Sequence, residues 1–86
     1  MKKKFELGLT DKIFYAKILS QDAEELFDTQ NYSKSLTRCY QAIKYVNEVF
    51  GETTDNNIKN ELAVLKDELE KLIQNAYSAG SLEKNQ

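Results

Sequence analysis

Apolar residues between positions 58 and 76 recur at alternating steps of four and three, and this spacing constrains the fold more than any other feature. The series is Ile58, Leu62, Leu65, Leu69, Leu72 and Ala76. An α-helix repeats every 3.6 residues, so all six side chains lie on one helical face. The segment therefore predicts an amphipathic helix over about 55–79, with Val64, Ile73 and Tyr77 beside the stripe and Gly80 as its stop.

Residues 32–50 carry the same spacing. Their main stripe is Tyr32, Leu36, Cys39, Ile43, Val46 and Phe50, and a second edge holds Tyr40, Ala42, Tyr45 and Val49. Gly51 follows directly, and glycine favours the left-handed turn that ends many helices. We therefore expect a helix over 32–50 that is apolar around more than half of its circumference.

A third periodic segment lies nearer the N-terminus. Its stripe is Ala16, Leu19, Ala23 and Leu26, widened by Ile13, Phe14, Ile18 and Phe27. Thr10 is the expected N-cap, because its hydroxyl can accept hydrogen bonds from the first helical turn. These residues predict a helix over 10–28, followed by a polar turn at 29–31. Between 52 and 57, Thr53, Thr54 and Asp55 are candidate caps for the last helix.

Together these segments predict an all-α protein, an antiparallel three-helix bundle over 10–80 with a short N-terminal arm at 1–9. Residues 81–86 are expected to form a flexible tail. The chain has no proline to break a helix, and no segment alternates at the period of two that a strand requires. Helices with short connections pack antiparallel around one core. The heptad-like spacing also permits a homodimer.

The absence of histidine and the presence of only one cysteine exclude most common kinds of catalytic site. The chain has no histidine, which removes imidazole bases, nucleophiles activated by histidine and metal sites that use it. The single cysteine, Cys39, cannot form an internal disulfide or a thiolate cluster and is expected to be a small buried hydrophobe. We therefore expect no enzyme, no catalytic residue, no metal and no cofactor.

Charge and hydropathy limit the classes of partner that the chain is expected to bind. The net charge is −2 and the pI is about 5.1, so a nucleic-acid partner is not expected despite Lys2, Lys3 and Lys4. No apolar run reaches the roughly 18 residues that span a bilayer, so no membrane insertion is expected. A signal peptide has an apolar stretch after its basic start, and no such stretch follows the lysines here. These features favour a cytoplasmic protein that binds a protein or peptide.

The stretch 16–49 resembles the first helical hairpin of the MIT (microtubule-interacting and trafficking) domain. The matching positions are Ala23, Asn31–Tyr32, Leu36, Ala42–Ile43 and Tyr45. The resemblance implies a three-helix adaptor over about 12–79, with partners such as the tails of membrane-remodelling ESCRT-type proteins. Ser35 stands where the family usually has alanine, and Cys39 where it usually has an aromatic residue.

Two other families are similar to the same stretch. A single tetratricopeptide repeat has such a hairpin, but no second copy follows about 34 residues later. The run 16–45 is also similar to the helical pair of HEPN proteins, many of which are ribonucleases that use an arginine followed by a histidine. Arg38 is present and histidine is absent, so a HEPN-like member would be catalytically inactive.

The apolar surplus on 32–50 predicts a binding groove, because each helix of a three-helix bundle buries roughly one stripe. We place the groove between the second and third helices. Its expected partner-binding residues are Ala42, Tyr45, Val49, Leu65, Leu69, Glu61 and Glu68. The alternative is a stand-alone inhibitor, antitoxin or immunity-type protein that blocks a folded enzyme with an acidic helix face containing Glu61, Asp67, Glu68 and Glu70. Both functional hypotheses compete with a purely structural interpretation. In that interpretation the tyrosines only border the core, and the acidic residues form a helix face exposed to solvent.

Overall fold

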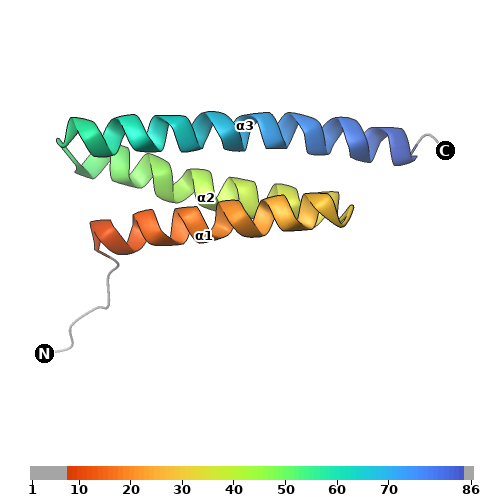
Figure 1. The fold of residues 1–86 in the computed structure, drawn as a ribbon, viewed down its shortest axis with the longest axis horizontal. Coiled ribbons are helices and arrows are strands. Elements are labelled where there is room, and N and C mark those ends of the chain that lie inside the picture. Colours follow the sequence, from red (N-terminus) through yellow and green to blue (C-terminus); the bar gives the residue numbers. More distant parts are fainter. Residues whose placement is uncertain (1–7, 85–86) are drawn as a thin grey trace, which may run out of the picture.

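The fold consists of three consecutive α-helices. A computed structural model describes the backbone of residues 8–84 and the side chains of residues 8–80. The helices are α1 (Leu9–Asp28), α2 (Tyr32–Glu52) and α3 (Asn56–Lys84), and no strand occurs in this described range (Figure 1). The all-α three-helix prediction is confirmed. Most of the predicted arm and the last two residues of the tail lie outside the described residues.

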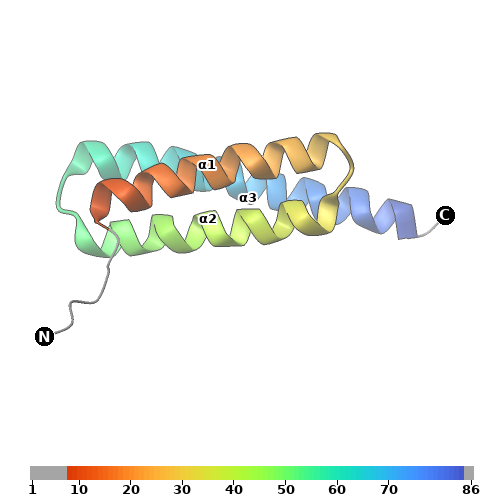
Figure 2. The same cartoon turned by 90° about the horizontal axis from the view of Figure 1, so that it is seen from below.

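The three helices are arranged as a hairpin with a third helix laid against it. α1 and α2 run antiparallel and pack along their length, and α3 turns back to run antiparallel to α2. Seen from below, after a turn of 90° about the horizontal axis, α3 lies behind the α1–α2 hairpin (Figure 2). α3 contacts α2 along its length but meets α1 at only a few points. The hairpin therefore has one face covered by α3 and an opposite face that α3 does not cover.

Small side chains form the contact between α1 and α2. The buried residues of α1 are Ala16, Ser20 and Ala23. Those of α2 are Ser35, Cys39, Ala42, Val46 and Val49. Such residues let two helix backbones approach closely, and the Ser35 hydroxyl donates a hydrogen bond of 2.7 Å across the contact to the Ala23 carbonyl. We call this contact the small-residue seam.

α3 contributes larger side chains to the core. Leu62 packs with Ala16, Val46 and Val49, and Leu69 packs with a second cluster around Ala23 and Ala42. The predicted stripe of α3 is confirmed, because its members are buried or partly buried: Ile58, Leu62, Leu65, Leu69, Leu72 and Ala76. Val64 and Tyr77, which flank the stripe, are exposed.

The predicted N-cap of the first helix, Thr10, is wrong by two residues, because the observed N-cap is Gly8. α1 begins at Leu9 behind an extended Gly8 (φ −76°, ψ 171°), and the Lys12 amide donates to the Gly8 carbonyl. Thr10 therefore lies inside the first turn, where its hydroxyl cannot cap the helix. Leu9, placed in the arm by the sequence, instead packs against the core.

Neither glycine expected to stop a helix does so. Gly51 and Gly80 both lie within helices, and neither has a positive φ. α2 ends instead at Glu52, and its C-cap, Thr53, is extended and buried and donates its amide to the Val49 carbonyl. Glycine permits a left-handed turn without requiring one, so its presence alone did not fix these helix ends.

The two connecting turns agree with the sequence. In the turn at 29–31, Gln30 has a φ of 68°, the only positive φ of a non-glycine residue in the described part of the chain. Before α3, the Asp55 carboxylate accepts hydrogen bonds from the amides of Asn57 and Ile58 at 2.8 and 3.4 Å. Asp55 is thus the cap of α3 that its residue type predicted.

Candidate docking surface

Most of the predicted groove between α2 and α3 lies in the core. Ala42, Val49 and Leu69 are fully buried, and Leu65 is partly buried against both core clusters. A partner cannot reach the three buried side chains unless the helices separate. The prediction of a surface groove lined by these residues therefore needs correction: the apolar surplus of α2 is used to pack both neighbouring helices.

The other three predicted site residues are accessible but scattered. Tyr45 is partly buried at the boundary between α2 and α1. Glu61 is exposed on α3 and pairs with Lys17 of α1 at 3.5 Å, whereas Glu68 is exposed farther along α3. The structure does not bring these residues together with Leu65 into one site.

Exposed apolar side chains instead gather on α1. Phe14 is 59% exposed, and Tyr15 and Ile18 are each 42% exposed. The Tyr15 ring lies 6.1 Å from the Phe14 ring and 6.1 Å from the Tyr45 ring, measured between centroids. We call this continuous surface, made of Phe14, Tyr15, Ile18 and Tyr45, the aromatic face. It crosses from α1 to α2 on the side of the hairpin that α3 does not cover.

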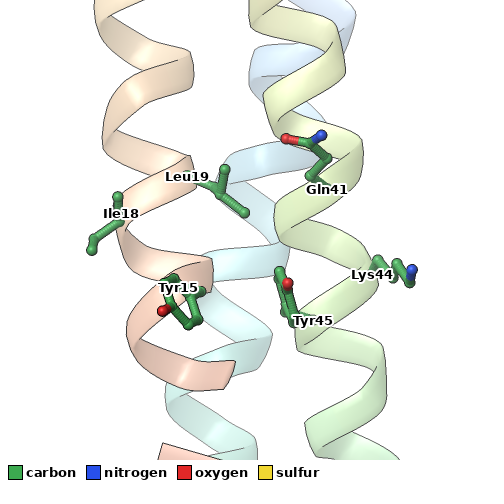
Figure 3. A pocket seen from close by; sticks show the side chains of 6 residues that line it. All are labelled: Tyr15, Ile18, Leu19, Gln41, Lys44 and Tyr45. Carbon is green, nitrogen blue, oxygen red and sulfur yellow. The ribbon is translucent and has the colours of Figure 1, made fainter. Parts of the chain in front are cut away.

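A shallow hollow of about 340 Å³ lies on this surface (Figure 3). It is lined by Tyr15, Ile18, Leu19, Gln41, Lys44 and Tyr45. Leu19 and the two tyrosines lie between the helices, whereas Ile18 and Lys44 lie on the outer sides of α1 and α2, and α3 passes behind. Its size is at the low end for ligand pockets, which suits one or two side chains of a partner.

Ion pairs bound the hollow at both ends. At one end, the Lys12 ammonium lies 3.2 Å from the Glu48 carboxylate and 2.6 Å from that of Glu52. These hydrogen-bonded carboxylates, chiefly that of Glu52, raise the pKa of Lys12. At the other end, Arg38 donates to the Asp22 carboxylate at 2.6 Å. These pairs link α1 to α2, and the Lys12 cluster keeps one excess negative charge because a single ammonium faces two carboxylates.

The sequence reading assigned Phe14 and Ile18 to the core and so missed the aromatic face. A helical projection would have found it, because the buried Ala16, Ser20 and Ala23 define one side of α1. Phe14 and Ile18 project far from that side at 100° per residue. The buried stripe of α1 consists of small residues. The larger apolar residues beside it made this stripe hard to recognise in the sequence.

A second exposed aromatic contact joins α2 to α3. The hydroxyls of Tyr40 and Tyr77 lie 3.0 Å apart, within hydrogen-bond distance. This hydrogen bond raises the pKa of Tyr40. Both rings are about half exposed, so the pair is a solvent-accessible hydrogen bond at the edge of the α2–α3 contact.

The remaining chemistry-bearing groups do not assemble into a reactive site. Cys39 is fully buried, and burial raises the pKa of its thiol. Across the described residues, no three side chains among cysteine and the acids are grouped to hold a metal ion. Within the same range, no helix combines the length and the apolar character needed to cross a bilayer.

No protein-family model, curated protein or solved structure matches the chain. The resemblances to MIT, tetratricopeptide and HEPN proteins therefore stay predictions from the sequence.

Proposed function

We propose that this chain is a non-enzymatic protein-interaction module that docks a segment of a partner protein on the aromatic face. The observation that carries the proposal is the exposure of Phe14, Tyr15 and Ile18 beside a hollow. Large apolar side chains scattered singly over a surface are ordinary, whereas contiguous ones mark partner sites. Tyrosine suits such sites because it offers apolar area and a polar tip.

The location differs from the one that the sequence suggested, and the class of function stays the same. An MIT-like adaptor remains the closest description of that class, since it too is a three-helix module that binds peptide segments. The alternative, an inhibitor with an acidic α3 face, has less support. Two carboxylates of that face are already paired, Glu61 with Lys17 and Asp67 with Lys71.

A paired substitution tests the proposal. We expect Phe14→Ser with Ile18→Ser to abolish capture of a partner from native lysate, measured by pull-down and mass spectrometry. Because both side chains are largely exposed, we expect the free energy of unfolding to change by no more than about 1 kcal/mol in total. Val64→Ser, at a 61% exposed position on α3, is the matched control and should leave capture intact.

The result can contradict the proposal in two ways. If the double variant stays folded and captures the same partner as the parent chain, the aromatic face is not the site. The double variant can also lose capture while the parent chain binds its partner only when that partner is folded. If no isolated segment of the partner then binds the parent chain, the inhibitor class replaces the adaptor class.

A further inference from the structure

The hairpin carries an excess of negative charge at the end where α1 begins. The Lys12 ammonium faces two carboxylates, those of Glu48 and Glu52, at 3.2 and 2.6 Å. The Asp11 carboxylate lies close to Gly8, since a Cβ added at Gly8 would be 3.9 Å from its Oδ2. Asp11 makes no ion pair among the described side chains. Three carboxylates and one ammonium therefore gather at this end.

The nearby basic residues do not cancel this excess. Lys17 is already paired with Glu61 of α3 at 3.5 Å. The Lys44 ammonium lies on the outer side of α2, away from the hollow (Figure 3). Complementary potentials favour the pairing of two surfaces, so this end of the hollow suits a basic guest.

Residues 1–7, which we call the N-terminal segment, join the hairpin on the side of the hollow. Gly8, Lys12, Tyr15 and Leu19 are spaced by four, three and four residues, so they follow one face of α1. Tyr15 and Leu19 line the hollow. At 1.5 Å per residue, Gly8 lies about 10 Å from Tyr15 along the helix axis. A seven-residue segment spans up to about 25 Å when extended, so it is long enough to reach the hollow.

The composition of the N-terminal segment matches that surface. Its lysines are Lys2, Lys3 and Lys4, and Phe5 follows them directly. Three lysines and one glutamate give the segment a net charge of +2. The chain has 12 basic and 14 acidic residues, so the remainder has 9 against 13 and a net charge of −4. A short tether also holds a segment near its site at an effective concentration of about 1 mM, so weak contacts suffice.

We propose that the N-terminal segment docks on the hairpin of its own molecule, with Phe5 in the hollow and with Lys3 and Lys4 beside Glu48 and Glu52. Exposed ion pairs contribute little, so Phe5 supplies most of the attachment and the segment stays displaceable.

Docking of this kind would regulate the aromatic face, and that role rests on the proposed function. A partner binds only the uncovered fraction of the molecules. A segment that covers the face for half to nine tenths of the time would therefore lower the affinity for a partner by about twofold to tenfold.

A tryptophan reporter tests the docking directly. The chain has no tryptophan, so Phe5→Trp introduces a single one. We expect acrylamide to quench its fluorescence about twofold to tenfold less than in the same chain with Tyr15→Ser and Ile18→Ser. Tyr77→Ser with Val64→Ser removes the same kinds of exposed side chain from α3 and should leave quenching unchanged. Circular dichroism checks that each variant is folded.

Charge substitutions test the lysines without altering the hairpin. In the Phe5→Trp chain, Lys3→Gln with Lys4→Gln should weaken docking by about twofold to tenfold and so increase quenching. Lys34→Gln with Lys71→Gln makes the same change in net charge at exposed positions and is the matched control. About 1 M salt should have the effect of the Lys3 and Lys4 substitutions, because it screens exposed charges.

Three outcomes would overturn the inference. Quenching that is equal with and without Tyr15→Ser and Ile18→Ser would show that the N-terminal segment does not dock in the hollow. Quenching that ignores Lys3→Gln with Lys4→Gln would remove the proposed charge pairing. Protection that grows with protein concentration would show that the occupant is the segment of a second copy.

The same variants separate this inference from the proposed function. Phe5→Ser should raise capture of a partner by about twofold to tenfold. If the tryptophan is protected in the hollow but no partner is captured by any variant, the docking of the segment stands and the proposed function fails. If the tryptophan is unprotected while capture depends on Phe14 and Ile18, the proposed function stands and this inference fails.

Discussion

At the residue scale, Ser35 shows how a polar side chain can belong to a core. It is fully buried, and its hydroxyl is satisfied by the Ala23 carbonyl. A buried hydroxyl without a partner would cost about 1–3 kcal/mol.

Substitutions at Ser35 should therefore rank by size. Ser35→Ala loses one buried hydrogen bond and should lower the free energy of unfolding by about 0.5–1.5 kcal/mol. Ser35→Val also forces extra methyl groups into the small-residue seam and should lower it by a further 1–3 kcal/mol or so.

Urea denaturation followed by circular dichroism measures both effects. The exposed Ser33→Ala variant is the control and should stay within about 0.5 kcal/mol of the parent chain. A valine at position 35 that is tolerated as well as alanine would show that α1 and α2 do not approach as closely as described.

At the element scale, the helices were predictable because their period extends over many turns. The stripe of α3 was correct residue by residue, and the turn residues at 29–31 and the Asp55 cap were also correct. The helix ends at the glycines were not. A glycine alters local preference by about 1 kcal/mol, and the hydrogen bonds and packing of a continuing helix override that preference.

The glycines supply a test of these helix ends. A methyl group added at Gly51 meets nothing within 4 Å, and one added at Gly80 meets only the Tyr32 Cβ at 3.9 Å. Alanine is the better helix former, so Gly51→Ala and Gly80→Ala should each leave stability unchanged or raise it by up to about 1 kcal/mol.

Thermal and urea unfolding both report this change. A loss of about 1 kcal/mol or more in either variant would indicate the left-handed helix stop that the sequence alone suggested. Each variant therefore distinguishes a continuous helix from a terminated one.

At the scale of the whole molecule, the fold class was predictable and the location of the exposed aromatic face was not. The period of a helix states which residues share a face, but it does not state which face a neighbouring helix will cover. α2 has more apolar surface than one contact needs, and the structure uses it for two contacts. α1 buries less apolar surface, because small residues form its contact with α2. Phe14 and Ile18 therefore remain exposed to solvent.

The stability of the whole molecule should fall in alkaline solution. The pKa values of Cys39, Tyr40 and Lys12 are all raised in the folded chain, by burial, by the Tyr77 hydroxyl and by Glu52 respectively. For each group the folded state holds its proton more tightly than the unfolded state does. The free energy of unfolding should therefore be steady near neutral pH and decline as the pH rises from about 8.5 through 11.

Urea denaturation at a series of pH values measures this decline. Tyr40→Phe removes one contributor and should make the decline above about pH 10 shallower. A free energy of unfolding that stays constant or rises between pH 8.5 and 11 would contradict the three pKa directions.

The small-residue seam has a consequence for recognition. It ties α1 to α2 with backbones held close and with ion pairs at both ends of the hollow. The proposed docking surface thus lies across a contact that close packing and ion pairs hold together before any encounter. Such preorganisation spares the receiving side most of the ordering entropy, so the entropic cost of association would fall mainly on the partner segment as it becomes ordered.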